Sequence, residues 1–316
     1  MAPARRVAGG AGSGPRAVLV TGGAGFIGTA VVRALRAAGH RVTVVDRSPP
    51  RDPEVTGIVG DLQDPDVRCA AVADGTDAIV HLAAATSVVG SISAPDRVFA
   101  DNVAVTAALL ELARVRRVPQ FVLASTNAVV GGAADGVITE QSPLRPLTPY
   151  GGTKAACEML LSAYGGSYDI APCVLRLTNV YGVGMSNKDS IVARLMRAAL
   201  SGATVQIYGD GEQRRDFIYV DDVAAAVGLA VEDAWARPII VGSGASISVL
   251  ELVDAVRRVC TTPLPVEHVP ARDGEMRVVE VDTGRARALG FEPRVTLDEG
   301  LASLWHEVRE TWDRGA

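Results

Sequence analysis

The chain has 316 residues, a hydrophobic content of 48% and a formal net charge of −5 at neutral pH. This length suits one large α/β unit or two modest domains, and the apolar content is ample for a buried core. The acidic balance, without a basic block, argues against a nucleic-acid binder, and no apolar run is long enough to span a bilayer.

The N-terminal segment and the cysteines bear on the cellular compartment. Residues 1–15 are rich in Ala, Gly, Arg and Pro and lack the apolar stretch of a signal peptide, so we expect a disordered tail and a cytoplasmic protein. The four cysteines lack metal-ligand spacing and are interpreted as buried free thiols in a reducing compartment. The histidines are equally dispersed, so no metal site is predicted. The abundance of Arg and Ala suggests a bacterial source. The cysteines are Cys69, Cys157, Cys173 and Cys260.

A glycine-rich turn follows the first predicted strand. Residues 17–21 form a short apolar run, and helical periodicity extends over residues 26–38 and stops at a glycine. Glycines between strand and helix let the backbone turn tightly and let a pyrophosphate approach the helix N-terminus. This order of elements predicts a dinucleotide site. The residues assigned to it are Gly22, Gly25, Phe26, Ile27 and Gly28.

The second predicted strand, residues 41–45, indicates which dinucleotide binds. It ends at Asp46, eighteen residues after Gly28. A carboxylate at this place accepts hydrogen bonds from the ribose hydroxyls and repels a 2′-phosphate, which favours NAD over NADP. Arg47 is adjacent and weakens this preference.

Strands and helices then alternate along the chain. Further strands are predicted at residues 56–59, 77–82, 120–125 and 171–177, and helices at 96–116 and 149–164. Such alternation predicts a parallel, doubly wound Rossmann-type sheet, which binds its ligand beyond the carboxyl ends of the strands. Asp61, Ala83, Thr126 and Asn179 follow predicted strands and are expected to face one crevice.

Beyond residue 180 the pattern loosens. Helices are predicted near residues 191–200, 220–230, 249–259 and 297–308, with a strand at 239–241. We expect an NAD-binding domain at residues 16–180 and a smaller α/β substrate-binding domain at residues 181–316, with chain crossings between them.

The most distinctive pair of residues is Tyr150 and Lys154. Only two of the 31 basic residues are lysine, and this one follows a tyrosine by four positions. On a helix the two side chains share a face. A nearby cation lowers the pKa of a phenol by roughly one to three units, toward the range in which tyrosine acts as a base. The alternative is an exposed helix turn on which the pair has no function.

Together these segments resemble the extended short-chain dehydrogenase/reductases, in particular the nucleotide-sugar epimerase/dehydratase family. The resemblance covers residues 17–301 and is more specific for the family than for the reaction. It is carried by residues 21–28, Gly60-Asp61-Leu62, His81-Leu82-Ala83-Ala84, Ser125-Thr126, Tyr150 with Lys154, residues 175–182 and Arg215-Asp216-Phe217.

The resemblance implies a role for each matching residue. Asp61 and Leu62 would hold the adenine, and Ala83 and Ala84 would line the nicotinamide side. Lys154 would bind the nicotinamide ribose and lower the pKa of Tyr150, while Thr126 would hydrogen-bond the sugar hydroxyl. Asn102 and Ser125 would belong to the cofactor pocket, and Asn179, Arg215 and Arg272 would grip a diphosphate. Surface ion pairs remain the alternative for the two arginines.

The implied chemistry is oxidation of a sugar at C4. Tyr150 would take the 4-hydroxyl proton while C4 passes a hydride to NAD⁺, and return of the hydride to the other face would give the C4 epimer. Sugar 4,6-dehydratases of the family carry an Asp-Glu pair after the catalytic Thr, where this chain has Asn127 and Ala128, so dehydration is disfavoured. We therefore expect a UDP-sugar 4-epimerase. The alternatives are a nucleotide-sugar 4-ketoreductase or a dehydratase of the same family and, more remotely, a non-catalytic NAD-binding sensor.

The substrate is less defined by the sequence. Thr86 stands where one subgroup of hexose epimerases carries lysine, Val130 replaces a usual tyrosine, and Val279 falls where the family gates bulk at C2. Lys188 is assigned either to a uronate carboxylate or phosphate, or to a solvated loop. The substrate pairs expected are UDP-glucose/galactose and UDP-glucuronate/galacturonate. On the resemblance alone, helices 96–116 and 149–164 would pack against a twin subunit in a homodimer.

Overall fold

The computed structural model describes residues 14–131, 136–186, 188–271 and 279–315. Residues 1–13 of the expected tail therefore lie outside the described residues. The chain divides into two compact units that exchange segments. The first unit holds the residues up to 129 together with 146–176 and 224–239, and the second holds 130–145, 177–223 and the residues from 240 onward. The chain thus returns to the first unit after residue 223.

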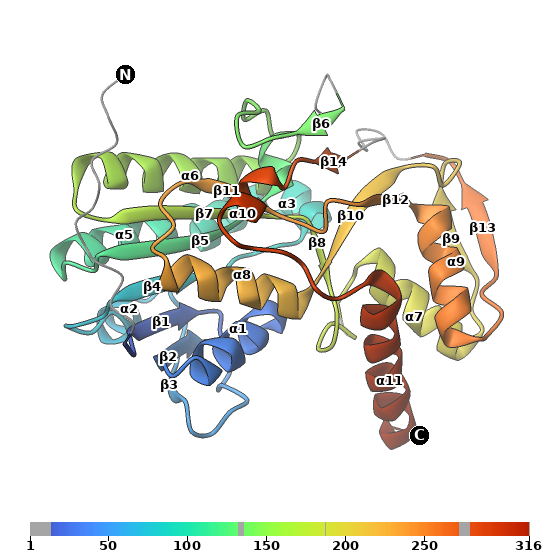
Figure 1. The fold of residues 1–316 in the computed structure, drawn as a ribbon, viewed down its shortest axis with the longest axis horizontal. Coiled ribbons are helices and arrows are strands. Elements are labelled where there is room, and N and C mark those ends of the chain that lie inside the picture. The colour runs from blue at the N-terminus through green and yellow to red at the C-terminus, as the bar shows by residue number, and fades with distance from the viewer. Residues whose placement is uncertain (1–13, 132–135, 187, 272–278, 316) are drawn as a thin grey trace. The chain divides into compact units, whose positions relative to one another are not determined.

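The first unit is built on a seven-stranded sheet with the strand order β11-β7-β5-β4-β1-β2-β3 (Figure 1). The pairs β3–β2, β2–β1, β1–β4 and β4–β5 are all parallel. The order reverses at β1, as in a doubly wound dinucleotide-binding sheet. Figure 1 shows α5 and α6 on one side of this sheet and α1 and α8 on the other. The predicted α/β class and parallel pairing are confirmed.

The elements of the first unit match the predicted ones closely where the sequence is strongly periodic. They are β1 (Ala17–Thr21), α1 (Phe26–Ala37), β2 (Arg41–Asp46), β3 (Thr56–Val59), α2 (Pro65–Ala71), β4 (Ala78–His81), α3 (Val88–Ser93), α4 (Pro95–Phe99), a π-helical turn (Ala100–Ala104), α5 (Val105–Val115), β5 (Gln120–Thr126), a 3₁₀ turn (Asn127–Val129), α6 (Pro149–Ser167), β7 (Ala171–Leu177), α8 (Val220–Glu232) and β11 (Pro238–Val241).

The hydrophobic core of this unit explains the apolar strands. β1, β4 and β5 contribute fully buried residues such as Leu19, Ile79 and Phe121, and α5 and α6 contribute Leu109 and Leu161. A sheet covered by helices on both faces buries both faces of its strands, which is why these strands read as continuous apolar runs. The core thereby fixes the position of each strand's carboxyl end.

One expectation about the cysteines was wrong. Cys157, Cys173 and Cys260 are buried free thiols, but Cys69 is exposed. Cys69 lies on the short helix α2, which buries Ala71 and turns most of its remaining side chains outward. A seven-residue helix with a single buried residue cannot cover a thiol.

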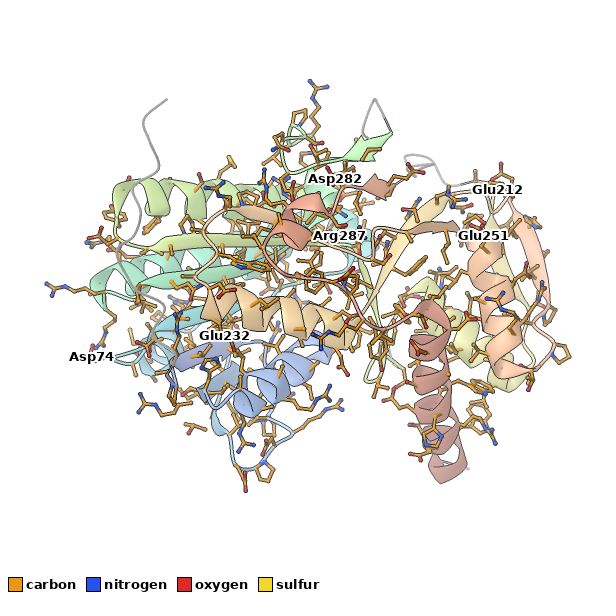
Figure 2. All side chains as sticks on the ribbon, in the orientation of Figure 1. Asp74, Glu212, Glu232, Glu251, Asp282 and Arg287 are labelled. Atoms are coloured by element: carbon orange, nitrogen blue, oxygen red, sulfur yellow. The ribbon has the colours of Figure 1, made fainter. Side chains whose placement is uncertain are left out.

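The second unit contains three small sheets and a group of helices. Its sheets have the orders β12-β10-β8, β13-β9 and β14-β6. In Figure 2 the labelled Glu251 marks the start of α9, where its carboxylate accepts a hydrogen bond from Ser248 N (2.6 Å) and Ser248 Oγ accepts one from Glu251 N (3.1 Å), a complete capping box. The elements are β6 (Val137–Ile138), β8 (Asn179–Tyr181), α7 (Ile191–Ser201), β9 (Val205–Tyr208), β10 (Arg214–Tyr219), β12 (Ser246–Ser248), α9 (Val249–Cys260), β13 (Val266–Val269), β14 (Glu280–Val281), α10 (Gly284–Ala288) and α11 (Leu297–Gly315).

Candidate active site

The glycine turn after β1 is packed too closely for side chains. A Cβ on Gly22, whose φ is +71°, would lie 2.7 Å from the backbone nitrogen of Ala83, and one on Gly28 would overlap the carbonyl oxygen of Gly22. Gly25 precedes α1 without any side-chain cap. The first N–H groups of this twelve-residue helix thus face the turn with no side-chain acceptor from their cap, an arrangement that suits a pyrophosphate. Phe26 and Ile27 begin the helix and are partly buried.

The carboxylate of Asp46, at the end of β2, is held beside this turn. Its Oδ2 accepts a hydrogen bond from the backbone N–H of Ala24 (3.1 Å), and its Oδ1 accepts one from Ser48 (3.1 Å). Arg47 is directed to Asp61, with 3.9 Å between Nη1 and Oδ2. A fixed carboxylate next to the glycine turn is the acceptor that an adenosine ribose requires. The neighbouring Leu62 is buried in the core, so only its backbone could serve the adenine.

A buried hydrogen-bond chain supports the end of β4. His81 Nδ1 lies 2.7 Å from Thr21 Oγ1, and His81 Nε2 lies 3.1 Å from Thr106 Oγ1. Because Thr106 donates its proton to Asn102 O (2.6 Å), it accepts from His81, which places the imidazole proton on Nε2. Thr21 Oγ1 in turn accepts from the N–H of Ala83 (3.2 Å). These hydrogen bonds fix the backbone at Ala83, where the sequence predicted a contact with the nicotinamide.

The buried imidazole of His81 in this hydrogen-bond chain makes the stability of the fold dependent on pH. Burial, helped by the charge of Lys154, lowers the pKa of His81 from 6.5 to about 3. The unfolded state therefore binds the proton more readily between these values, so the stabilisation present above pH 6.5 is lost as the pH falls toward 3. We expect His81 to remove about 2 kcal/mol of unfolding free energy between pH 7 and pH 5. Urea unfolding of wild type and His81→Gln at both pH values tests this, and equal pH dependence of the two proteins would contradict it.

Asn102, in the π-helical turn, fixes the loop after β4. Its Oδ1 accepts from the N–H of Ala85 (2.8 Å), and its Nδ2 donates to Ala85 O (3.1 Å) and to Thr153 Oγ1 (3.0 Å). The side chain is completely buried. The amide of Asn102 thus joins this loop to α6, and by binding Ala85 it holds the adjacent Ala84 in place. Thr86, the next residue of the loop, is exposed. π-turns of this kind are frequent at functional sites.

Tyr150, Lys154 and Thr126 come together at the carboxyl end of β5. Lys154, almost fully buried, donates from Nζ to Ala124 O (2.9 Å). Thr126 is the last residue of β5, and its hydroxyl lies close enough to the Tyr150 phenol to lower the pKa of that phenol. The predicted grouping of the strand end with the Tyr/Lys helix face is therefore present in the structure.

The pKa of Tyr150 is raised, whereas the sequence predicted that it would be lowered. Burial raises the pKa of Tyr150 to about 12, and the hydrogen bond with Thr126 offsets only part of that rise. Burial also lowers the pKa of Lys154. The reason is desolvation: the low-dielectric interior disfavours phenolate and ammonium alike, and spacing in the sequence carries no information on that term. Within the protein alone, Tyr150 is a neutral phenol.

The start of α6 places the tyrosine in the first helical turn. Thr148 caps the helix by accepting from the N–H of Gly151 (3.3 Å), and Pro149 occupies the first position, where its missing N–H has no cost. Gly151 is fully packed: a Cβ there would lie 2.6 Å from the carbonyl oxygen of Ala128, in the turn after Thr126. The absence of a side chain lets the helix approach the end of β5. The sequence analysis assigned no function to this glycine.

Gly151→Ala is expected to push α6 away from β5 and to lower kcat by about 10- to 100-fold, because displacements near 1 Å in a catalytic group cost this much. Its neighbour Gly152 has open space at the Cβ position and provides a matched control. Gly152→Ala should retain activity and stabilise the helix by up to about 1 kcal/mol. Steady-state kinetics and thermal melts of both variants decide, and equal activities would refute the close-approach argument.

The residues assigned to the substrate are divided between the two units. Thr86 and Thr126 lie in the first unit, and Asn179, Arg215 and Val279 lie in the second. Asn179 begins β8 and donates from Nδ2 to Asp216 O (2.9 Å), and Arg215 in β10 donates to Arg214 O (2.8 Å). Val279 is buried, at 4% exposure, and Lys188 is exposed. Arg272 lies outside the described residues. The structure thus places the cofactor and catalytic residues, together with Thr86, in the first unit and the other described substrate residues in the second.

Two further features bear on the kind of site. Among the described side chains, no cluster of three or more His, Cys, Asp or Glu could hold a metal ion. None of the helices within the described ranges is both long and apolar enough to cross a membrane. The residues that sequence reasoning missed include Thr106, which acts through hydrogen bonds, and Gly151, whose lack of a side chain allows close packing. Only Gly151, in a run of small residues at the start of a helix, left a visible signal.

The chain is similar to nucleotide-sugar enzymes over most of its length. It is 34% identical to a dTDP-glucose 4,6-dehydratase of Streptomyces niveus, and the alignment covers 93% of this chain and 94% of the relative. It is also 34% identical to a UDP-glucose 4-epimerase of Mycolicibacterium smegmatis, over 90% of this chain and 96% of the relative. A solved structure, MoeE5 in complex with UDP-glucuronic acid and NAD, matches with 37% identity and a TM-score of 0.87, covering 94% of this chain and all of the other.

The match to a family model agrees with these likenesses and with the cofactor that the sequence predicted. It spans residues 18–241, more than half of the chain, from β1 to the end of β11. The glycine turn and the helix with Tyr150 and Lys154 both fall within these residues. The chain belongs to the NAD dependent epimerase/dehydratase family.

Proposed function

We propose that this protein is an NAD-dependent nucleotide-sugar C4 epimerase acting through a transient 4-keto sugar. The observation that carries the proposal is the convergence of Thr126, Tyr150 and Lys154 at the end of β5, within the unit that holds the glycine turn and Asp46. Similarity to both an epimerase and a dehydratase supports sugar oxidation at C4 as the first step.

The catalytic residues divide the proton transfer between them. The Thr126 and Tyr150 hydroxyls would hydrogen-bond the sugar 4-hydroxyl, and Tyr150 would take its proton as base. When bound, NAD⁺ supplies the acceptor for the hydride from C4 and adds positive charge next to the phenol. Lys154, fixed by Ala124 O, would bind the nicotinamide ribose and stabilise the phenolate. Return of the hydride to the other face of C4, together with reversal of these proton transfers, would give the epimer.

The residues after Thr126 favour epimerisation over dehydration. Removing water across C5 and C6 requires an acid and a base near those atoms, and Asn127 and Ala128 carry no group that titrates near neutral pH. Asn127 is 6% exposed, and both polar atoms of its amide are buried. These side chains leave the 4-keto sugar with hydride return as its route forward.

The substrates proposed are UDP-glucose/UDP-galactose and UDP-glucuronate/UDP-galacturonate. Asn179, Arg215 and Arg272 would hold the diphosphate, since guanidinium groups bind phosphate oxygens in a bidentate manner. The buried Val279 would limit bulk at C2. Lys188 would meet the uronate carboxylate, so Lys188→Ala should raise KM for the uronate and leave KM for the neutral sugar unchanged. An unchanged KM for both removes Lys188 from the substrate site.

The direct test is to incubate the purified protein with UDP- and TDP-sugars and identify the products by NMR. The proposal predicts a C4 epimer at equilibrium with its substrate and no net change in absorbance at 340 nm. A 4-keto-6-deoxy sugar would identify a dehydratase instead. Stoichiometric NADH consumption would identify a reductase.

We also propose a homodimer whose interface buries α6, the helix with Tyr150 and Lys154, and its neighbours α3 and α4. α3, α4 and α6 pack against one another, and their exposed apolar side chains include Val89 and Ile92 (both 66%), Phe99 (55%) and Met159 (55%). A surface of this kind marks an interaction site. Light scattering should give twice the mass of the chain, and Ile92→Glu should shift it toward the monomer. A monomeric wild type would refute the proposal.

A further inference from the structure

The helix that carries Tyr150 and Lys154 has a third buried polar side chain on the same face. Glu158 follows Lys154 by four residues, as Lys154 follows Tyr150, so the three side chains lie one above another along α6. Glu158 is 2% exposed. A carboxylate buried to this degree needs a charged or hydrogen-bonding partner, because desolvation of an unpaired charge is strongly unfavourable.

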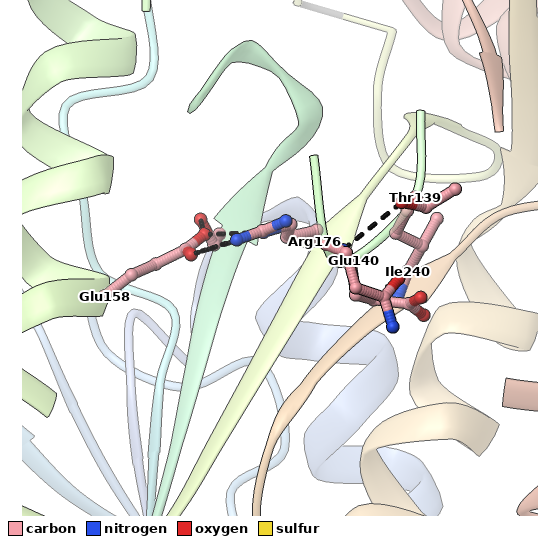
Figure 3. A network of polar contacts seen from close by, with 7 residues as sticks. Thr139, Glu140, Glu158, Arg176 and Ile240 are labelled. Carbon is pink, nitrogen blue, oxygen red and sulfur yellow. Dashed lines mark hydrogen bonds and ion pairs between the residues drawn. The ribbon is translucent and has the colours of Figure 1, made fainter. Parts of the chain in front are cut away.

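The partner of Glu158 is Arg176 on β7, which is 3% exposed. The guanidinium donates from Nη2 to Oε2 (2.8 Å) and from Nε to Oε1 and Oε2 (3.1 and 3.2 Å). Figure 3 shows the two side chains directed toward each other between the helix and the strand. Arg176 is the charged residue of an otherwise apolar strand, Ala171–Leu177, and it forms an ion pair with this carboxylate. The ion pair ties α6 to the neighbour of β5 in the sheet.

The same carboxylate also binds β5. Ser125 donates from Oγ to Glu158 Oε1 (2.5 Å), one residue before Thr126 and one after Ala124. Two consecutive residues of β5 thus hydrogen-bond to side chains on α6, Ala124 to Lys154 and Ser125 to Glu158, and the third, Thr126, lies close enough to Tyr150 to lower the pKa of that phenol. The first and last of these contacts involve proposed catalytic groups, and the middle link, between Ser125 and Glu158, has no catalytic atom.

We propose that Glu158 and Arg176 are positioning residues of the active site: the buried pair locks α6 against the end of β5 through Ser125 and so sets the alignment of Thr126, Tyr150 and Lys154. Its kinetic consequences rest on the proposed function, and its structural consequences do not. Loss of the middle link lets the helix and the strand end shift relative to each other while the side chains that touch the sugar remain present. The expected signature is a fall in kcat without a matching rise in KM.

The pair also acts on the charge of Lys154. Burial lowers the pKa of Lys154, while Cys157 and Glu158 on its own helix raise it. On β4, His81 is the titratable group whose pKa responds to Lys154, and it is neutral at physiological pH. Replacing Glu158 with a neutral side chain removes one of the two contributions that raise the pKa of Lys154, so the pKa of Lys154 should fall.

The kinetic test uses Glu158→Gln, Ser125→Ala and their double variant. Each single change should lower kcat about 10- to 100-fold with KM within about threefold of wild type. The double variant should lose no more than the worse single one, because the two residues act through one link. Glu111→Gln, which removes a carboxylate from an exposed pair with Arg114 on α5, is the matched control and should behave as wild type. Ser125→Ala leaves the ion pair intact, and it keeps the test valid should Glu158→Gln fail to fold.

A second readout is independent of turnover. Because the chain has only two lysines, ¹³C labelling of lysine gives two side-chain signals, and Lys188→Ala assigns them. The titration midpoint of Lys154 should fall in Glu158→Gln and stay unchanged in Glu111→Gln. A falling midpoint with no turnover by wild type would reject the proposed function and keep the positioning pair. A kcat within threefold of wild type in both single variants, additive losses in the double variant, or an unmoved midpoint would overturn the positioning pair.

Discussion

Replacing Tyr150 with Phe is expected to lower kcat by about 10³-fold while leaving NAD binding unchanged. The phenol is the group proposed to take the sugar proton, and phenylalanine keeps the ring but has no proton to exchange. The side chain is 8% exposed, so the ring continues to fill its place in the fold. The measurement is kcat for epimerisation together with the NAD bound per chain.

Tyr164→Phe supplies the control for this change. Tyr164 lies on the same helix, α6, but its hydroxyl is directed to Glu111 (3.3 Å), in an exposed contact. This variant should keep wild-type kcat. If Tyr150→Phe retains more than a tenth of the wild-type rate, the proton is taken by another group and the assignment of the base is wrong.

Gly28→Ala is expected to abolish NAD binding and to cost about 1–3 kcal/mol of unfolding free energy, the range found for overpacked sites. The added Cβ would overlap Gly22 O and lie 2.6 Å from the Cα of Gly23. All these contacts are backbone, so no side chain can move aside, and the turn that receives the pyrophosphate must open. Urea unfolding and the NAD content of the purified variant measure the two effects.

Gly228→Ala is the corresponding control, because Gly228 lies in α8 and has open space at the Cβ position. It should bind NAD normally and gain up to about 1 kcal/mol in unfolding free energy. A Gly28→Ala variant that binds NAD as tightly as wild type would show that the turn after β1 is not the cofactor site.

The first unit was largely predictable because its signals are local and mutually consistent. β1, the glycine turn and α1 were predicted within one residue, since an apolar strand, small turn residues and 3.6-residue periodicity all point to the same arrangement. Lys154 stood out because lysine is rare in this chain. The grouping of Tyr150 with Thr126 followed from the rule that parallel strands share one carboxyl edge.

What sequence could not supply depends on distances and burial. The short strands β6, β8, β12 and β14 have only two or three residues, too few for a period to be read. The pKa of Tyr150 is dominated by desolvation, a property of the packed interior. The roles of Gly151 and Glu158 depend on atoms in other elements, Ala128 O and Arg176, that are distant in sequence or carry no motif.

The pattern of errors follows the same division. Cys69 was expected to be buried by analogy with the other cysteines, but α2 is too short to cover it. The single helix expected at residues 96–116 contains a π-helical turn, which turns Asn102 to the loop after β4. In both cases the prediction followed from the residue types, and the local backbone geometry produced the difference.

The central claim is that the protein removes a hydride from C4 of a nucleotide sugar and returns it to the same carbon. It is tested most directly with a UDP-sugar substrate deuterated at C4, with product analysis by NMR and mass spectrometry. The account predicts that both C4 epimers retain the deuterium at C4, with none in the solvent. Deuterium at C6 of a 4-keto-6-deoxy product, or its loss from the sugar, would contradict the account.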